Sequence, residues 1–322
     1  MIPQSLGSGE RDGWVVAWNL RRTSRYALVN GPGGVRPLRA ENRRAIRIRL
    51  VNTGTYTQLM PKAPRSSSES TSSGPTPNLG GPAEDEWEVV DVLSGKLRRQ
   101  IDFQGQRYLD IGCGNGAFTL RLGSGFDEVH GVDVEQERLA DFERKIRQNR
   151  ATNVTAHLMS AEALDFPDDY FDVVTAIETI EHIPDLDSAL DEIFRVLKPG
   201  GLFGITAPNR LFPFETHGIW WKGEERGGRV PLLPYVPPLH DRLALARVFT
   251  NRSLKRLLEP RGFTRIGLDY AYPTLERGHR FGRWASSLKG RMRKLEESKM
   301  RCFGVSIVTT YQKTPSAVPL NG

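Results

Sequence analysis

The chain has 322 residues, of which 38% are hydrophobic and 26% are charged, and a formal net charge of +7. No run approaches the about 18 consecutive apolar residues of a membrane-spanning helix, and the N-terminus shows no basic segment followed by an apolar one. Two cysteines make neither a disulfide framework nor a zinc site, which suits a reducing compartment. We therefore predict a cytoplasmic protein without a membrane span or a secretory signal.

Most of the positive charge lies near the N-terminus. Residues 1–83 carry 12 Lys and Arg against four Asp and Glu, which leaves a net charge of −1 for residues 84–322. Residues 61–82 are rich in Ser, Pro, Gly and Thr and cannot bury enough apolar area to offset the entropy of ordering. The sequence predicts a basic, disordered leader over residues 1–83 that ends in a flexible linker, with Met60 as an alternative start of the chain.

From residue 84 onward the hydrophobic pattern becomes regular. Strands are expected at residues 107–111, 128–134, 154–159, 171–177, 202–207, 263–270 and 303–310, and helices at residues 135–148, 186–197 and 251–258. Strands alternating with helices predict an α/β fold with a doubly wound, Rossmann-like sheet of about seven mostly parallel strands. We expect one domain over residues 84–313, made of a core (105–207), an insertion after the fifth strand (208–250) and a C-terminal part (251–313), before a tail at 314–322.

A glycine-rich turn follows the first expected strand, with glycines at positions 112, 114 and 116. Glycines allow a tight turn and let backbone N–H groups approach a ligand without an intervening Cβ. Asp133 closes the next strand about twenty residues later, where a carboxylate can accept hydrogen bonds from both ribose hydroxyls. The turn predicts a nucleotide-type cofactor. NAD and S-adenosylmethionine both remain open, because Gly112, Gly114 and Ala117 also fit the dinucleotide fingerprint.

Residues 109–116 resemble motif I of the class I S-adenosylmethionine-dependent methyltransferases (type 11 methyltransferase domain). Further segments resemble the motifs of that family in the same order: its second strand, its adenine loop, the start of its fourth strand and the turn before its fifth strand, at residues 129–133, 160–168, 171–174 and 196–201. The resemblance implies S-adenosyl-L-methionine as the cofactor. It implies cofactor contacts at Asp110, Gly112, Cys113, Gly114, Gly116, Asp133, Val134, Ala161, Glu162 and Ile177.

Two details of these motifs lead to separate expectations. The family often has Asp where this chain has Ser160, so we expect Glu162 or the backbone of Ala161 to carry more of the adenine contact. In the later turn, Pro199 should stop the preceding helix, and Gly200 or the next glycine should supply its left-handed cap.

The segment after the fourth strand, residues 177–184, contains two glutamates and a histidine. Ligands of open α/β sheets bind at the carboxyl ends of the strands, so this segment should border the reacting groups. If it begins a helical turn, Glu178, Glu181 and His182 lie on one face. They can then bind a divalent cation, act as a general base with its orienting partner, or cap and shape the site.

The same Glu-x-x-Glu-His pattern resembles that of ubiquinone-biosynthesis O-methyltransferases and of metal-dependent small-RNA 2′-O-methyltransferases. That resemblance implies a cation, Mg²⁺ or another divalent ion, held by Glu178, Glu181, His182 and a later histidine. His217 is the expected fourth ligand because it follows the fifth strand closely, whereas His240 is expected in a lid or on the surface.

Two further segments have distinctive compositions. Residues 208–250 are rich in proline and aromatic side chains, and they either cover an apolar or aromatic acceptor or form a small core of their own; the aromatic residues are Phe212, Phe214, Trp220, Trp221 and Tyr235. Residues 276–301 carry nine Lys and Arg against three Glu. A solvated helical face is the preferred interpretation there, with nucleic acid or an anionic membrane surface as alternatives.

Together these patterns predict an enzyme: an S-adenosylmethionine-dependent methyltransferase acting on the oxygen of a small apolar or phenolic molecule by direct SN2 transfer. Glu178, Glu181 and His182 are its predicted catalytic residues. An RNA 2′-O-methyltransferase is the alternative, although the nearly neutral domain and the lack of an RNA-recognition module disfavour a nucleic-acid partner. An NAD-dependent oxidoreductase and a non-catalytic cofactor-binding protein are the alternatives from other classes.

Overall fold

The computed structural model describes residues 15–17, 26–31, 34–39, 88–227, 230–274 and 294–314. The chain divides into two compact units, Met1–Ser70 and Thr71–Gly322. In the first unit, the backbone forms an antiparallel sheet of three strands, β1 (Val15–Ala17), β2 (Tyr26–Gly31) and β3 (Gly34–Arg39). These strands fall within the leader predicted to be disordered. Met60 and the linker predicted at residues 61–82 lie outside the described residues.

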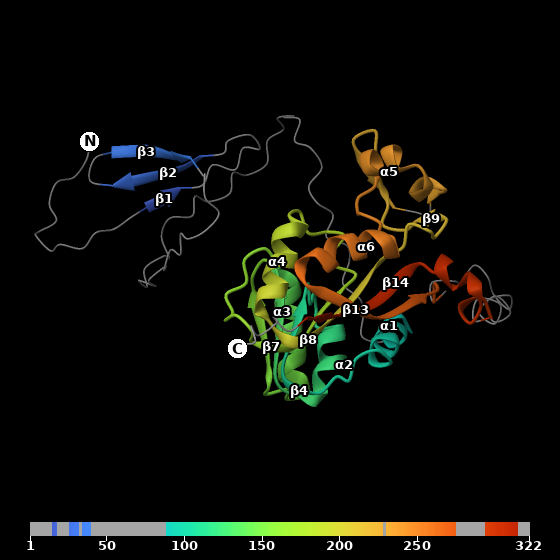
Figure 1. The fold of residues 1–322 in the computed structure, drawn as a ribbon, viewed down its shortest axis with the longest axis horizontal. Coiled ribbons are helices and arrows are strands. Elements are labelled where there is room, and N and C mark those ends of the chain that lie inside the picture. Colours follow the sequence, from blue (N-terminus) through green and yellow to red (C-terminus); the bar gives the residue numbers. More distant parts are fainter. Residues whose placement is uncertain are drawn as a thin grey trace, which may run out of the picture. The chain divides into compact units, whose positions relative to one another are not determined.

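The second unit is built on a seven-stranded sheet with the order β13-β14-β8-β7-β4-β5-β6 (Figure 1). Its strands are β4 (Gly105–Ile111), β5 (Phe126–Asp133), β6 (Val154–Leu158), β7 (Phe171–Ile177), β8 (Leu197–Pro208), β13 (Phe263–Ala271) and β14 (Ser306–Lys313). Strands β4 to β8 pair in parallel, whereas β14 runs antiparallel to both β8 and β13. The predicted doubly wound, mostly parallel sheet is confirmed.

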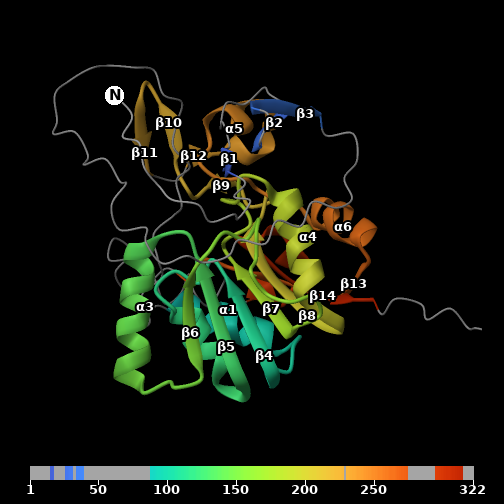
Figure 2. The same cartoon turned by 90° about the vertical axis from the view of Figure 1, so that its left-hand side faces the viewer.

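Helices cover both faces of this sheet. They are α1 (Glu88–Arg98), α2 (Ala117–Leu122), α3 (Gln136–Asn149), α4 (Leu186–Val196) and α6 (Asn251–Leu258), whereas α5 (Pro237–Leu243) lies apart from the sheet. Short 3-10 turns are η1 (Gly123–Gly125), η2 (Leu233–Tyr235), η3 (Glu259–Arg261) and η4 (Lys299–Phe303). Neighbouring residues of β4 face opposite layers, since Leu109 packs in the cluster with α4 and α6 and Tyr108 in the cluster with α1 and α2. In Figure 2, α3 lies beside β6 at the edge of the sheet. Within the described residues, no helix is long and apolar enough to cross a membrane.

Local side chains account for where two of these helices begin. The Asp185 carboxylate accepts a hydrogen bond from the backbone N–H of Ser188 at the start of α4 (3.1 Å). At the start of α6, the Thr250 hydroxyl accepts from the Ser253 N–H while the Ser253 hydroxyl oxygen accepts from the Thr250 N–H. Both arrangements satisfy N–H groups that have no partner inside a first helical turn.

The end of α4 differs from the prediction. The helix stops at Val196, and its C-cap residue Leu197 already has an extended conformation because it pairs with Phe171 of β7. Pro199 therefore does not end the helix, and neither following glycine caps it. Instead, Gly200 (φ +80°) lies in a bulge, where the register between β7 and β8 shifts. Sheet pairing overrides the local signal here.

The insertion at residues 208–250, called the lid below, contains most of the remaining elements. They are β9 (Phe214–Glu215), β10 (Ile219–Trp221), β11 (Glu224–Arg226), β12 (Val230–Pro231), η2 and α5. The lid has an interior of its own, since Leu233 and His240 are buried, yet Phe214, Trp221 and Tyr235 are partly exposed. Of the predicted basic segment, residues 276–293 lie outside the described residues, as do residues 315–322 of the predicted tail.

Two glycines with nearly equal backbone angles occupy very different surroundings. Gly116 (φ +79°) precedes α2, and a Cβ there would lie 1.9 Å from the Phe142 ring. Gly200 (φ +80°) has open space where its Cβ would be. The backbone penalty of a side chain is thus shared by both positions, whereas the steric penalty belongs to Gly116 alone.

We predict that Gly116→Ala lowers the free energy of unfolding by about 2–5 kcal/mol and that Gly200→Ala lowers it by about 1–2 kcal/mol. The difference arises because both variants force an L-residue into the left-handed region, but only the first must also displace a buried ring. Urea denaturation of the two variants and the parent chain measures it. Equal losses in the two variants would contradict this account of the turn.

Candidate functional site

A cavity of about 300 Å³ lies at the carboxyl ends of β4, β5 and β7. The segment after β4, the end of β5, the loop after β6 and the end of β7 all contribute to it, as expected for an open α/β sheet. Eight of the ten predicted cofactor residues line the cavity: Gly112, Cys113, Gly114, Asp133, Val134, Ala161, Glu162 and Ile177. The side of the cavity near α1 and α2 is apolar, with Val89, Leu93 and Phe118.

The glycine-rich loop is held against β5 by its backbone. The N–H groups of Gly112 and Cys113 both donate to the carbonyl oxygen of Val132 (2.8 and 3.0 Å). The Asp133 carboxylate accepts from the N–H of Gly114 and from the N–H of Glu135 (2.9 Å each). Each carboxylate oxygen keeps a further lone pair, so Asp133 is fixed in direction and can still accept hydrogen bonds from a ligand in the cavity.

Asp110 and Gly116 support the loop from behind and do not line the cavity. Asp110 is buried, and its carboxylate accepts hydrogen bonds from the hydroxyls of Thr119 (2.6 Å) and Thr175 (2.8 Å). Burial raises the pKa of Asp110 to about 6, against the lowering effect of these two hydroxyls. Asp110 therefore ties β4 to α2 and β7, while Gly116 makes room for Phe142.

The loop after β6 is stabilised by its own polar groups. The Ser160 hydroxyl oxygen accepts from the N–H of Glu162 (3.2 Å) and donates to the Glu162 carboxylate (3.3 Å). The second carboxylate oxygen of Glu162 accepts from the N–H of Asp185 (2.7 Å). Ser160 thus shapes the loop, and Glu162 joins it to the segment before α4 while lining the cavity.

The segment after β7 forms a turn rather than the start of a helix. Glu178 has a left-handed conformation (φ +49°), and its N–H donates to the carbonyl oxygen of Thr206 in β8. The N–H of His182 donates to the carbonyl oxygen of Thr179 (3.0 Å). The helical turn considered for residues 178–182 does not form, because Glu178 still follows the sheet while Glu181 and His182 belong to the turn.

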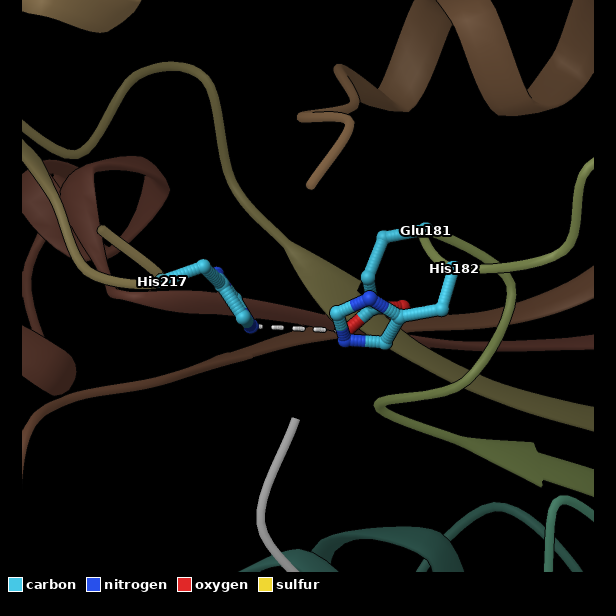
Figure 3. Close-up of side chains that lie close together, drawn as sticks. All are labelled: Glu181, His182 and His217. Atoms are coloured by element: carbon cyan, nitrogen blue, oxygen red, sulfur yellow. Dashed lines mark ion pairs between the residues drawn. The ribbon is translucent and has the colours of Figure 1, made fainter. Parts of the chain in front are cut away.

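Three side chains gather beside the cavity, and one of them comes from the lid. Ligand atoms of Glu181, His182 and His217 all lie within 4.8 Å of one another. The Glu181 carboxylate is 3.6 Å from His217 Nε2 and 3.9 Å from His182 Nε2, and Figure 3 shows His217 approaching from a separate stretch of chain. Three of the four predicted metal ligands therefore meet in the described structure, and Glu178 lies outside this group.

Of the two glutamates of this segment, Glu181 is buried and Glu178 is half-buried. Within the described residues, neither carboxylate oxygen of Glu181 has a hydrogen-bond partner, and neither does Oε1 of Glu178. Burial raises the pKa of Glu181 well above its ordinary value, and the nearby charge of Glu178 raises it further. Burial also raises the pKa of Glu178. A site of this kind favours an added positive charge, either a proton or a cation.

The structure also identifies two supporting residues that the sequence did not reveal. Glu215 is buried in the lid, between the backbone N–H of His217 and the imidazole of His240. His240 lies in the lid as expected, and its side chain is buried. Arg247 donates from its guanidinium to the carbonyl oxygens of Ile183 and Pro184, and its N–H donates to that of Glu181 (3.3 Å). No local motif marks either residue, since Glu215 pairs with His240 25 residues later and Arg247 bonds to the turn at residues 181–184.

We predict that Arg247→Ala accelerates amide hydrogen exchange in the turn at residues 178–184, because the variant removes two hydrogen bonds that join this turn to the C-terminal end of the lid. Arg252→Ala, an exposed arginine on α6, is the matched control and should leave exchange in the turn unchanged. Exchange followed by mass spectrometry of peptides provides the measurement. An unchanged turn in Arg247→Ala would remove this residue from the site.

Comparison with known proteins shows what part of this chain resembles. Residues 109–205 match the family described as methyltransferase domain. The ubiquinone/menaquinone biosynthesis C-methyltransferase of Vibrio parahaemolyticus is 40% identical over 124 residues, covering 34% of this chain and 48% of that protein. The ubiquinone biosynthesis O-methyltransferase of Methylococcus capsulatus is 36% identical over 115 residues, covering 35% of this chain and 48% of that protein.

The family match lies in the core of the second unit. The chain spans about half the length of the curated relatives it matches. Among solved structures, a Listeria monocytogenes protein described as an S-adenosylmethionine dependent methyltransferase superposes with a TM-score of 0.50 at 17% identity. The superposition covers 70% of this chain and 99% of the Listeria chain, and it confirms the fold.

Proposed function

We propose that this chain, whose residues 109–205 form a methyltransferase domain, is an S-adenosylmethionine-dependent methyltransferase that methylates an oxygen of a small apolar or phenolic molecule. One observation carries the proposal: a single cavity joins the predicted cofactor residues to His182 and His217 beside the buried Glu181. The methyltransferase match argues against the NAD-dependent alternative. Cytoplasmic location stays a prediction from the two cysteines, Cys113 and Cys302, which are both free.

The residues of the cavity fit the proposed cofactor. Asp133, oriented by two backbone N–H groups, offers acceptor positions for ribose hydroxyls, and Val134 and Ala161 provide apolar surface beside it for a purine. Gly112 brings the loop against Thr179, since a Cβ at Gly112 would lie 2.3 Å from the Thr179 side chain. The cofactor supplies an electrophilic methyl group on a sulfonium sulfur. The chain must therefore position the acceptor and remove its proton.

An imidazole suits the proton-removing role. His182 and His217 both line the cavity, and a neutral imidazole can accept the proton of an acceptor hydroxyl as the oxygen attacks the methyl carbon. Glu181, less than 4 Å from a ring nitrogen of each histidine, would orient the ring and stabilise its protonated form. Glu178, which also lines the cavity, adds negative charge near Glu181. Val89, Leu93 and Phe118 form an apolar surface that fits an apolar or aromatic acceptor.

The relatives do not decide which atom is methylated, because their names include both a C- and an O-methyltransferase. The polar cluster supports oxygen. A hydroxyl is a weak nucleophile until its proton is accepted, and two imidazoles beside a buried carboxylate can accept it at neutral pH. Transfer would then proceed by direct displacement at the methyl carbon.

A divalent cation is a further part of the proposal. Glu181, His182 and His217 would hold it, and a bound cation would act as a Lewis acid that lowers the pKa of an acceptor hydroxyl. The carboxylate oxygens without hydrogen bonds favour such an ion. Two imidazoles and one carboxylate suit a first-row transition ion such as Mn²⁺ or Zn²⁺ better than Mg²⁺, which prefers oxygen ligands.

We predict that the double variant Glu181→Gln/His182→Ala lowers turnover by about 10²–10⁴-fold while its affinity for S-adenosylhomocysteine stays within about twofold of the parent, because these groups act on the acceptor. Asp133→Ala should show the opposite pattern, with about 10- to 100-fold weaker S-adenosylhomocysteine binding. Product release against a panel of phenols and quinols measures turnover, and calorimetry measures binding. Near-normal turnover in the double variant would exclude this cluster as the catalytic group.

We also predict that the chain binds Mn²⁺ at one site that is lost in Glu181→Gln and in His217→Gln, because each variant removes one of three ligands. The exposed lid variant Glu224→Gln is the matched control and should bind normally. Electron paramagnetic resonance of free Mn²⁺ reports binding without any assay of activity. If the parent chain leaves the Mn²⁺ signal unchanged, or if His217→Gln binds as well as the parent, the cation part of the proposal fails.

A further inference from the structure

A deeply buried carboxylate–imidazole pair of the lid has no part in the proposed transfer. Glu215 on β9 and His240 on α5 are each only 1% exposed, and Glu215 Oε2 lies 2.6 Å from His240 Nε2. A carboxylate removed from water in this way is costly unless its oxygens are satisfied. The replacement of such a pair by apolar residues is often neutral or stabilising, so stability alone does not explain its presence.

The other oxygen of Glu215 contacts the backbone of a site residue. Glu215 Oε1 accepts a hydrogen bond from the N–H of His217 at 2.8 Å. The two oxygens of one buried carboxylate therefore bind His240 on one side and the His217 main chain on the other. His240 fixes Glu215, and Glu215 fixes the point from which the His217 side chain extends.

The position of the His217 main chain matters because His217 belongs to the lid, whereas Glu181 and His182 belong to the turn after β7. Its Nε2 lies 3.6 Å from the Glu181 carboxylate, and its ring centroid lies 5.4 Å from that of His182. Figure 3 shows the His217 side chain extending toward the other two across the gap between separate stretches of chain. A small rotation of the lid segment would remove His217 from this group.

The base of the lid is secured independently. The N–H of Phe249 donates to the carbonyl oxygen of Pro208 (2.8 Å), and the N–H of Arg210 donates to that of Phe249 (2.7 Å). The side chain of Asn209 donates to the carbonyl oxygens of Cys302 and Gly304 (2.8 and 2.7 Å). These contacts attach the two ends of the lid to the sheet, but they do not determine where His217 lies within it.

We infer that Glu215 is a positioning residue: together with His240 it forms a buried lock inside the lid that holds His217 against Glu181 and His182. This inference rests on the proposed function for its catalytic meaning, but the geometry of the lock stands by itself. The lock makes completion of the site depend on folding of the lid, so a lid that covers an acceptor also brings the third polar side chain to it.

A nuclear Overhauser contact between the His182 and His217 rings tests the lock in the full chain, with histidine labelled and EDTA present. We expect the contact in the parent chain, its loss in Glu215→Ala and His240→Ala, and its retention in His240→Gln, whose amide can still donate to Glu215. Glu224→Ala, an exposed acid of the same lid, should retain it. Should Glu215→Ala not fold, the parent chain and the two His240 variants decide the question.

Three results would overturn the inference: no ring contact in the parent chain, an undiminished contact in Glu215→Ala, or a loss in His240→Gln as complete as in His240→Ala. With an acceptor that is turned over, Glu215→Ala should lower kcat by about 10- to 100-fold, the range for groups that orient a functional histidine. The KM for S-adenosylmethionine should stay within about twofold, because Asp133 and the glycine-rich loop are untouched. A parent chain with the ring contact but no methyl transfer would refute the proposed function and leave the lock intact.

Discussion

The close contact between the turns that follow β4 and β7 determines what this site can do. Gly112 and Thr179 lie so near each other that a single Cβ at Gly112 would overlap the Thr179 side chain. Because these turns touch, the glycine-rich loop after β4 and the turn at residues 178–184 line one cavity. A methyl group carried on one side can then face an acceptor held on the other. Effective methyl transfer requires this proximity, since displacement at carbon depends on aligned reacting atoms.

The turn after β7 also places two acidic side chains close to each other. The half-buried Glu178 lies close to the buried Glu181, so the charge of Glu178 raises the pKa of Glu181, and hydrogen bonds do not satisfy all their oxygens. His182 from the turn and His217 from the lid place ring nitrogens within 4 Å of Glu181. A proton or a cation shared among these groups would neutralise the site. The lid therefore helps to neutralise the charge at this site through His217, in addition to covering the site.

Local sequence patterns predicted the sheet and much of the cofactor surface, because strands such as residues 171–177 and turns such as residues 112–116 are encoded within a few neighbouring residues. They failed where contacts distant in sequence decide the outcome. The extended Leu197 pairs with β7, so α4 ends before Pro199. The N–H of Glu178 donates to the Thr206 hydroxyl in β8, so residues 178–182 do not form a helical turn. Glu215 and His240 are 25 residues apart and form no motif.

The features set by contacts distant in sequence are also those that would choose the acceptor. The segment that matches the family model, residues 109–205, ends before the lid, and the relatives of this chain include methyltransferases named for different acceptor atoms. The lid supplies His217 through the Glu215–His240 lock, and α1 supplies Val89 and Leu93 on the apolar side. Both contributions come from outside the matched segment. In the proposed methyltransferase, acceptor selection therefore follows from elements added around the sheet, while the sheet and its glycine-rich loop position the methyl donor.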